Sequence, residues 1–418
     1  MLPKVSVGRH CCASSTNIEN YRPLVGDAII DEILELSRSL RGVRICNINA
    51  TASGGGVAEL LSRQIPIYQS LGVVADWRII HGDKDFFTIT KGFHNALQGA
   101  EFKLTPAVIN DYLEHNRLSA EALEGEYDAY VVHDPQPAAL RHFVKHNSQK
   151  WIWRCHIDTS EPNPAVWEFL RPYIESHDAA VFTMKQFVPP DLEMERVFFI
   201  PPAIDPLSTK NMELPLDLCR RVIADSGVNL REPILLQVSR FDPWKDPLGV
   251  IRAYRLVKEQ RRGVQLVLVG AMAGDDPEGW GILETINAEV AIDPDLYVFT
   301  NMTGVGNMEV NAFQRGADLI IQKSLREGFG LVVSEALWKA KPIVAGAAGG
   351  IPMQFPQSYK QFLTDSVEDC AADLLYLLDH PDVAKSFGAA GKEHVRGQFL
   401  LPALIRNEFR MIAQLLNR

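Results

Sequence analysis

Apolar residues recur along the chain in two alternating series of short hydrophobic runs and amphipathic segments. The first series predicts strands over 42–49, 73–80, 127–134, 149–156, 179–184 and 197–200, and helices over 26–40, 57–71 and 106–118. The second predicts strands over 234–239, 264–270, 296–300, 317–322 and 343–345, and helices over 247–259, 306–315 and 331–340. Strands joined by helical crossovers pair in parallel, so each series predicts a doubly wound α/β domain.

A proline-rich stretch separates the two series. It runs Pro201-Pro-Ala-Ile-Asp-Pro206, and polar residues follow it to about Glu213. Because proline cannot join a central sheet, we interpret this stretch as a linker and place the first domain at 1–205 and the second at 206–398. Residues 399–418 have helical spacing with no strand after them. We expect this segment to form a helix that packs back on the first domain.

Composition and charge narrow the class of protein. Hydrophobic residues make up 46% of the 418 residues and charged residues 22%, as in ordinary globular proteins. The formal net charge of −10 argues against a nucleic-acid partner, which selects a basic surface. No apolar run reaches the roughly 18 residues of a membrane helix, and the N-terminus lacks the apolar core of a signal peptide. The six cysteines form no CxxC pair, which indicates reduced thiols and a cytoplasmic location.

The most informative stretch is Glu327-Gly-Phe-Gly-Leu-Val-Val-Ser-Glu335, between a predicted strand and a predicted helix. Gly328 and Gly330 allow a ligand to approach the backbone, and the amides and dipole of a helix start favour an anion. Glu327 precedes the helix and Glu335 lies about two turns into it, so both can face one cleft. The stretch therefore predicts a site for a ligand that carries phosphate and hydroxyl groups.

Two basic residues follow the first strand of the second domain. Arg240 and Lys245 flank a turn that Pro243 makes rigid, so both can reach one anionic group. Arginine offers a planar fork to phosphate oxygens, and lysine a point charge. Taken alone, Arg240 and Lys245 would be interpreted as two solvated surface cations. Beside the turn at Gly328 the pair is better interpreted as a diphosphate clamp.

Polar residues also gather at the predicted carboxyl ends of strands in the first domain. These are the glycines 54–56, His133 with Asp134, and His156 with Asp158. Ligand groups collect at such ends in parallel sheets. A single histidine there is more often structural, but the repeated placement favours a functional role for His156.

The glycine loop has two other interpretations. It can be a structural tight turn, or the start of a dinucleotide fingerprint, since Asp76 lies about 20 residues further on. Glu59 occupies the position of that fingerprint's third glycine, which disfavours a nicotinamide cofactor.

Together these features resemble the retaining GT-B glycosyltransferases of family four, over nearly the whole chain. The E-G-F-G-L-x-x-x-E-A-L motif within 322–350 is the most specific part. The first half is similar to the trehalose glycosyltransferring synthases of that family. The similar stretches are Ile18-Glu-Asn-Tyr-Arg-Pro-Leu, Asn49-Ala-Thr-Ala-Ser-Gly-Gly-Gly-Val-Ala-Glu-Leu-Leu, Val132-His-Asp-Pro-Gln-Pro and Trp153-Arg-Cys-His-Ile-Asp.

The resemblance implies a GT-B fold, with two Rossmann-like domains facing a central cleft, and a role for each matching residue. It implies that Arg240 and Lys245 bind the donor diphosphate, Glu327 the transferred sugar and Glu335 the ribose. His156 would lie over the donor sugar. The implied backbone contacts to the donor come from Gly55, Gly56, Gly328, Phe329, Gly330 and Leu331. The candidate acceptor contacts are Asn49, Asp134 and Asp158.

The implied reaction moves glucose from a nucleoside-diphosphate glucose, such as UDP-glucose or ADP-glucose, to free glucose. The product is α,α-trehalose, formed reversibly and with retention. A trehalose phosphorylase, another family-four transferase with a different acceptor, and a sugar-nucleotide epimerase are alternatives. A noncatalytic sugar-binding regulator is a further one, although it would be expected to lose a basic residue of the clamp. The short chain favours the synthase.

We expect no metal and no other cofactor. The chain has no Asp-x-Asp motif at a strand end, and Asp275-Asp276 falls in a predicted surface loop. No second carboxylate is placed as a nucleophile, so the two-carboxylate glycosidase scheme fits poorly and same-face attack is expected. The sequence leaves the assembly open, with a homodimer as one candidate.

Overall fold

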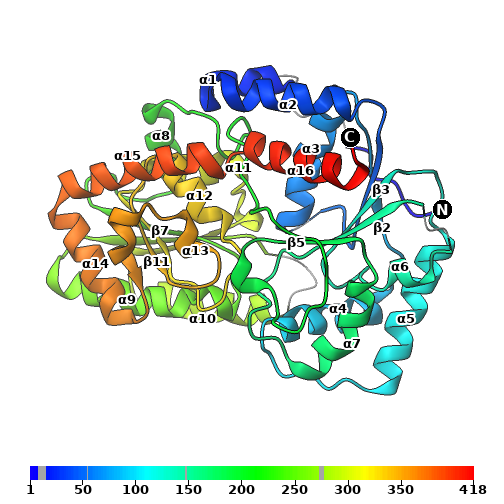
Figure 1. Ribbon diagram of the computed structural model, residues 1–418. Helices are drawn as coiled ribbons and strands as arrows, with labels where there is room; N and C mark the ends of the chain where they lie inside the picture. The colour runs from blue at the N-terminus through cyan, green and yellow to red at the C-terminus, as the bar shows by residue number, and fades with distance from the viewer. Residues whose placement is uncertain (8–15, 54, 146–147, 273–276) are drawn as a thin grey trace. The chain divides into compact units, whose positions relative to one another are not determined.

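The chain folds into two compact α/β units in the computed structural model, which describes residues 1–7, 16–53, 55–145, 148–272 and 277–418. Unit 1 consists of Met1–Ala203 and Leu401–Arg418, and unit 2 is Ile204–Leu400. Each unit has its own six-stranded parallel sheet with helices on both faces (Figure 1). The predicted fold class is confirmed. Cys11, Cys12, Gly54, Asp275 and Asp276 lie outside the described residues.

The sheet of unit 1 has the strand order β2-β1-β3-β4-β5-β6, and all neighbours pair in parallel. Its strands are β1 (Arg44–Asn49), β2 (Val74–Ile79), β3 (Ala129–His133), β4 (Lys150–Arg154), β5 (Ala179–Phe182) and β6 (Val197–Phe199). Since β1 has β2 on one side and β3 on the other, the winding reverses between β1 and β3. The carboxyl ends of β1 and β3 therefore form the switch point where open α/β sheets bind ligands.

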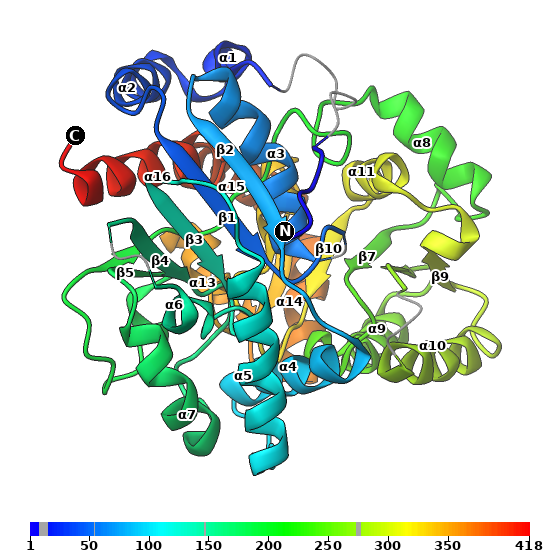
Figure 2. The ribbon, with the colours of Figure 1, turned by 90° about the vertical axis from the view of Figure 1, so that its right-hand side faces the viewer.

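Helices cover both faces of this sheet, as Figure 2 shows. One face carries α4 (Lys84–Leu97), α5 (Pro106–Glu121), α6 (Leu140–Phe143) and α7 (Pro164–Glu175). They enclose an apolar core in which alternate residues of the strands, such as Trp151 and Trp153, meet rings such as Phe93 and Tyr112. The other face carries α3 (Gly56–Ser70) and α16 (Leu401–Leu416). Among the residues that the structure describes, unit 1 also has η2 (Ile18–Tyr21), α1 (Arg22–Val25), α2 (Asp27–Ser39) and η3 (Lys185–Phe187).

The final helix, α16, is fixed to unit 1 by buried polar contacts. Glu408 is only 6% exposed. It pairs with Arg154 on β4 and accepts hydrogen bonds from Gln64 and Tyr68 on α3. Because a buried charge is stable only when paired, these contacts make α16 part of the unit's core.

The sheet of unit 2 has the order β12-β11-β10-β7-β8-β9, again fully parallel. Its strands are β7 (Ile234–Val238), β8 (Gln265–Gly270), β9 (Leu296–Thr300), β10 (Leu319–Gln322), β11 (Ile343–Gly346) and β12 (Leu363–Thr364). The helices are α8 (Leu216–Asp225), η4 (Pro243–Lys245), α9 (Pro247–Gln260), α10 (Pro277–Val290), η5 (Asn301–Thr303), α11 (Asn307–Gly316), α12 (Leu331–Trp338), α13 (Ile351–Gln354), η6 (Gln357–Phe362), α14 (Val367–Asp379) and α15 (Pro381–Gln398). The switch point of this sheet lies between β7 and β10.

The stretch 201–213, which we interpreted as a linker, is largely packed into unit 2. The Ile204 N–H donates to the Phe399 carbonyl at 2.9 Å, and Ile204 forms a parallel bridge with Leu400. Asn211 is 2% exposed. The boundary between the units falls at Ala203, inside the stretch that we interpreted as a linker, and the polar residues after the prolines bond within unit 2. Within the described ranges, no helix is long and apolar enough to cross a membrane.

Candidate active site

The first element of the candidate site is the turn that follows β7. Asp242 caps η4, and its side chain accepts a hydrogen bond from the Lys245 N–H at 3.2 Å. The cap fixes the backbone from which Lys245 projects. The Arg240 side chain is 61% exposed and lies 3.4 Å from the Asp242 carboxylate. Arg240 is therefore free to turn toward an anion, whereas Lys245 starts from a fixed turn.

The second element follows β10, the strand next to β7. Glu327 Oε2 lies 2.6 Å from Lys245 Nζ, and both side chains are mostly buried. Ser324 Oγ also contacts Glu327 Oε2, at 3.3 Å. The structure thus brings Lys245 and Glu327 together at the switch point, although 82 residues separate them. Spacing alone predicted a ligand role for each residue but not this direct pair.

The glycine loop 328–330 leads into α12. Gly330 adopts a left-handed conformation, with φ 82° and ψ 66°, and α12 begins at Leu331. The first N–H groups of an α-helix have no partners within the helix, so they can meet an anion. Two later glycines support the loop. A Cβ at Gly349 would lie 1.6 Å from the Glu327 carbonyl oxygen, and one at Gly350 2.7 Å from that of Gly328. The loop after β11 therefore packs directly against the loop after β10.

Glu335, on α12, is 1% exposed, and both its carboxylate oxygens have partners. Oε1 lies 2.7 Å from Lys210 Nζ, and Oε2 accepts a hydrogen bond from Gln314 at 3.0 Å. Burial works to raise the pKa of Glu335, but the charges of Lys210 and Lys339 hold that pKa below its usual value. Glu335 is consequently ionised and held within unit 2, in a setting quite different from that of Glu327.

Lys339 lies one turn after Glu335 and is also buried. Its Nζ is 2.8 Å from Asn211 Oδ1 and 3.4 Å from the Glu335 carbonyl. Burial lowers the pKa of Lys339 to about 7, against the opposing effect of the Glu335 charge. Neither Lys210 nor Lys339 was predicted as a site residue from the sequence. Lys339 could have been noticed because it is a charged residue inside the largely apolar stretch 331–345. No feature of the sequence marks Lys210.

In unit 1, the residues predicted after β1 are mostly engaged with the chain itself. Asn49 Oδ1 accepts a hydrogen bond from the Trp77 indole at 2.7 Å, and its Nδ2 donates to the Thr51 carbonyl at 2.8 Å. Gly55 has φ 85° and caps α3, which begins at Gly56. These contacts fix the start of the loop and place an amide-rich helix start at the switch point.

The residues after β3 and β4 form one connected group. Asp134 has φ 64°, a strained value for a non-glycine residue. Its carboxylate accepts a hydrogen bond from the His156 N–H at 2.8 Å. Burial raises the pKa of Asp134 to about 7, although the His156 N–H and Arg154 act in the opposite direction. The structure therefore brings Asp134 and His156 together through the backbone.

His156 also contacts His133 through its ring. His133 Nδ1 lies 2.9 Å from His156 Nε2, and the two ring planes are only 13° apart, with 5.3 Å between centroids. Asp158, by contrast, bonds locally to the N–H and hydroxyl of Ser160. The predicted acceptor residues of unit 1 thus belong to three separate local arrangements, at Asn49, at Asp134 and at Asp158.

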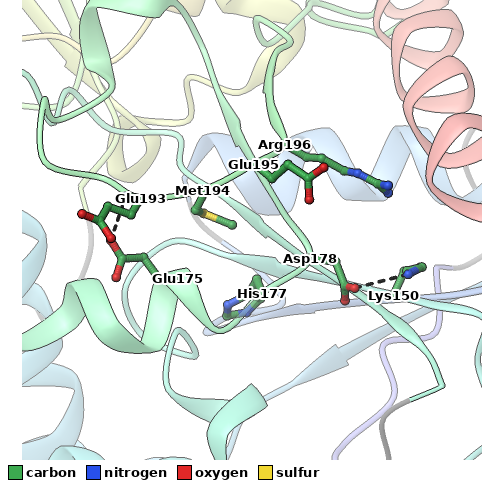
Figure 3. Close-up of a pocket in the computed structure, with 8 residues that line it drawn as sticks. All are labelled: Lys150, Glu175, His177, Asp178, Glu193, Met194, Glu195 and Arg196. Atoms are coloured by element: carbon green, nitrogen blue, oxygen red, sulfur yellow. Dashed lines mark hydrogen bonds and ion pairs between the residues drawn. The ribbon is translucent and has the colours of Figure 1, made fainter.

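A polar hollow of about 340 Å³ lies elsewhere in unit 1 (Figure 3). It is lined by Lys150, Glu175, His177, Asp178, Glu193, Met194, Glu195 and Arg196. Lys150 begins β4, and Asp178 and Arg196 directly precede β5 and β6. The hollow therefore lies at the amino ends of the strands, the edge opposite the predicted ligand side. Among the described residues, no group of three or more acidic, histidine or cysteine side chains is arranged to hold a metal ion.

Comparison with known proteins extends the sequence resemblance. A family model described as "Trehalose synthase, N-terminal domain" matches residues 47–189, and one described as "Glycosyl transferases group 1" matches 220–394. The chain is 50% identical to a trehalose synthase of Rubrobacter xylanophilus over 422 residues, covering all of both chains. It is 45% identical to a trehalose synthase of Pyrococcus horikoshii, covering 92% of this chain and 93% of that one.

More distant similarities concern a second activity and the fold. A trehalose phosphorylase of Grifola frondosa is 27% identical, and the match covers 91% of this chain but 58% of the phosphorylase. A sucrose-phosphate synthase structure from Thermosynechococcus elongatus aligns with a TM-score of 0.70 at 15% identity, over 90% of this chain and 99% of that one. A UDP-forming α,α-trehalose-phosphate synthase from Burkholderia xenovorans aligns with a TM-score of 0.71 at 15% identity, over 89% and 100%. At this identity the structures show a shared fold, the GT-B class.

Proposed function

Since the chain belongs to the trehalose synthase family of glycosyltransferases, we propose that it transfers glucose from a nucleoside-diphosphate glucose to free glucose. The product is α,α-trehalose, formed reversibly and with retention at the anomeric carbon. The observation that carries this proposal is the 2.6 Å contact between Lys245 Nζ and Glu327 Oε2 at the switch point of unit 2. This contact places the Lys245 ammonium group, which can bind a diphosphate, beside the Glu327 carboxylate, which can accept hydrogen bonds from sugar hydroxyls.

Unit 2 supplies the donor contacts in this proposal. Lys245 binds the diphosphate with one of its three N–H donors while another stays with Glu327. Arg240, largely exposed, turns in to complete the clamp. Glu327 accepts hydrogen bonds from hydroxyl groups of the transferred glucose. Glu335 is proposed to accept them from the ribose, for which its buried carboxylate exchanges one of its present partners, Lys210 or Gln314, for a ribose hydroxyl. The amides of Gly328, Phe329, Gly330 and Leu331 face the phosphates and the sugar.

The proposed chemistry breaks one bond and forms one. The bond from glucose C1 to the diphosphate oxygen breaks, and the O1 hydroxyl of the acceptor glucose forms the new bond to C1 on the same face. The acceptor proton passes to the departing diphosphate. Negative charge grows on that diphosphate, and fixed positive charges from Arg240, Lys245 and the helix start stabilise it before it forms. These protein charges supply what a bound metal ion would supply, so the proposal includes no metal and no other cofactor.

Unit 1 has a second set of proposed roles. His156 lies over the donor sugar, and Gly55 and Gly56 contact phosphate and acceptor. Asn49, Asp134 and Asp158 are the proposed acceptor contacts. Asp134 acts at least partly through His156, because its carboxylate holds the His156 N–H.

Trehalose phosphorylase activity is the second candidate, supported by the similarity to the Grifola protein. The chain spans just over half of that phosphorylase, whereas it matches the Rubrobacter synthase from end to end. The full-length match favours the synthase reaction.

A substrate panel tests the proposal. The protein is incubated with UDP-, ADP- or GDP-glucose and glucose labelled with 13C at C1, and the products are identified by NMR. A disaccharide with an α,α-1,1 linkage is expected with at least one donor, and its absence with every donor would overturn the proposal. Glucose 1-phosphate formed from trehalose and phosphate would establish the phosphorylase instead.

A further inference from the structure

We propose that His133 is a positioning residue for His156, acting within a hydrogen-bond chain that runs from Asn47 through His133 to His156. The contact between His156 and the donor sugar depends on the function proposed above. The hydrogen-bond chain itself rests on the geometry of unit 1.

The chain of hydrogen bonds crosses three neighbouring strands. Asn47 is on β1, His133 ends β3, and His156 follows β4, and these strands are adjacent in the order β1-β3-β4. Asn47 Oδ1 lies 3.1 Å from His133 Nε2, and His133 Nδ1 lies 2.9 Å from His156 Nε2. Asn47 is 3% exposed and His133 is 2% exposed. Both are thus held rigidly at the switch point, behind the half-buried His156.

The amide oxygen of Asn47 sets the direction of every proton in the chain. The amide oxygen faces His133 Nε2, while Asn47 Nδ2 is buried without a partner among the described residues. Oδ1 can only accept a hydrogen bond, so in this orientation of the amide His133 carries its proton on Nε2 and leaves a lone pair on Nδ1. That lone pair must accept, so His156 carries its proton on Nε2. The consequence is that Nδ1 of His156 keeps a lone pair, to which none of the described residues donates a hydrogen bond. The opposite orientation of the amide would place the proton of His133 on Nδ1, which is the outcome that the spectra described below would detect.

Both rings are kept neutral. Burial is the main cause that lowers the pKa of His133 and of His156 well below the usual value, and the Arg154 guanidinium lowers both further. Asp134, the nearby carboxyl group, bonds to the His156 backbone and not to either ring. Two neutral imidazoles can form this series of hydrogen bonds without either ring carrying a charge. The tautomer of His133 then fixes both the tautomer and the orientation of His156.

The assignment gives His156 a defined chemical role toward a ligand. A ring nitrogen with a lone pair accepts a hydrogen bond from a hydroxyl group and repels another acceptor, such as a phosphate oxygen. His156 Nδ1 is therefore set to receive a sugar hydroxyl, and His133 and Asn47 maintain that setting. If His133 served packing alone, the tautomer of His156 would not depend on residue 47.

The first experiment reads the tautomers in the free protein. Long-range 15N–1H spectra of protein labelled with 15N-histidine, at pH 7, are expected to show His133 and His156 as neutral rings protonated at Nε2. A charged ring, or a proton on Nδ1 of either residue, would overturn the proposal. This readout needs no turnover, so it separates failure of the hydrogen-bond chain from failure of the proposed function, which the substrate panel tests.

The second experiment uses Asn47→Asp. The new carboxylate lies beside His133 Nε2 and stabilises the charged imidazolium. The pKa of His133 therefore rises. Once charged, His133 donates from Nδ1 and forces the His156 proton from Nε2 to Nδ1. The acid limb of the kcat–pH profile is expected to move to higher pH by about one unit. An unmoved acid limb in an active, folded variant would contradict the proposal.

A matched pair of substitutions completes the test. His133→Phe keeps an aromatic ring but removes the hydrogen-bond acceptor. It should lower kcat about 10–100-fold with unchanged nucleotide affinity, as expected when His156 is misplaced. His177→Phe is the control, because His177 is equally buried but lies at the opposite edge of the same sheet, with Nδ1 bonded to backbone carbonyls. Equal losses in the two variants would show a packing effect and overturn the proposal.

Discussion

The carboxylate of Glu335 lies 2.7 Å from the ammonium group of Lys210, and only 1% of Glu335 is exposed. Lys210 comes from the segment that immediately follows the crossing into unit 2, whereas Glu335 lies on α12. This buried pair therefore fixes the start of unit 2 to the helix that carries the proposed donor site. A buried carboxylate that loses its cation is strongly destabilising.

Replacing Lys210 by Met should accordingly lower the free energy of unfolding by about 3–5 kcal/mol. Urea unfolding followed by circular dichroism measures the change. Arg261→Met is the matched control, since Arg261 forms a 2.7 Å pair with Asp379 in which both side chains are exposed. Exposed pairs contribute about 0–1 kcal/mol, so equal losses in both variants would show that burial of Glu335 is not the cause.

Removal of either basic residue of the proposed clamp should impair transfer. Arg240→Ala and Lys245→Ala should each cost about 2–4 kcal/mol in kcat/KM, because both charges face a diphosphate whose charge grows in the transition state. Initial rates over a range of donor concentrations give the value. Lys258→Ala is the control, since Lys258 pairs with Asp293 at 2.6 Å, as Lys245 does with Glu327, but from α9. Unchanged turnover in either clamp variant would remove its assignment.

Glu327→Gln should slow transfer while leaving binding of the free nucleotide largely intact. The amide keeps the size of the side chain but loses the charge that faces the sugar hydroxyls. Calorimetric titration with the nucleoside diphosphate, alongside rate measurements, distinguishes the two effects. If the variant loses nucleotide binding, the proposed roles of Glu327 and Glu335 must be exchanged.

The buried Lys339 should make stability depend on pH. Its pKa in the folded state is about 7, below the unfolded value of about 10.4. Between these values the unfolded chain binds one more proton, so the contribution of Lys339 to the free energy of unfolding rises with pH, by up to about 1.4 kcal/mol per pH unit.

Comparison with Lys339→Met isolates this contribution, because every other titrating group is common to both proteins. Urea unfolding at several pH values between 6 and about 10 should show wild type gaining stability relative to the variant above pH 7. A constant difference across this range would show that Lys339 keeps its proton in the folded state.

Chelation tests the proposal that no metal ion takes part. Treatment with EDTA, followed by exchange into metal-free buffer, should leave kcat/KM for transfer unchanged. Loss of activity that returns on addition of Mg²⁺ or Mn²⁺ would show that Arg240, Lys245 and the helix start do not suffice for the departing diphosphate.

The apolar pattern predicted the strands well but missed several helices. The buried strands of a parallel sheet are short continuous runs of residues such as Ile234–Val238, which stand out against polar flanks. The helices α4, α7, α8, α10, α14 and α15 were not predicted. In α7, Pro164 and Pro172 interrupt the pattern, yet Asn163 caps the helix through hydrogen bonds to the Ala165 and Val166 N–H groups. An asparagine followed by a proline at the first helical position is typical of a helix start, so Asn163-Pro164 could have predicted α7 where the apolar pattern did not.

The candidate site was predictable where its chemistry is local in sequence. Arg240, Lys245 and Glu327 follow strand ends that the sequence identifies, and parallel topology explains why such ends meet. The contacts of Glu335 with Lys210 and of His133 with Asn47 join residues 125 and 86 positions apart. Neither partner has an unusual sequence context, so only the strand order and the packing of 204–211 reveal them.

The passage of the chain out of unit 1 and back constrains how the protein is made. During translation, residues 1–203 and then all of unit 2 are synthesised before α16, the helix that carries Glu408. Until then Arg154 lies in a nascent sheet without its buried carboxylate partner. Unit 2 is inserted between these two parts of unit 1, and the Ile204–Phe399 hydrogen bond joins its two ends. Domains generally fold as units during synthesis, so we expect unit 2 to fold before α16 is made. Unit 1, although translated first, is completed last.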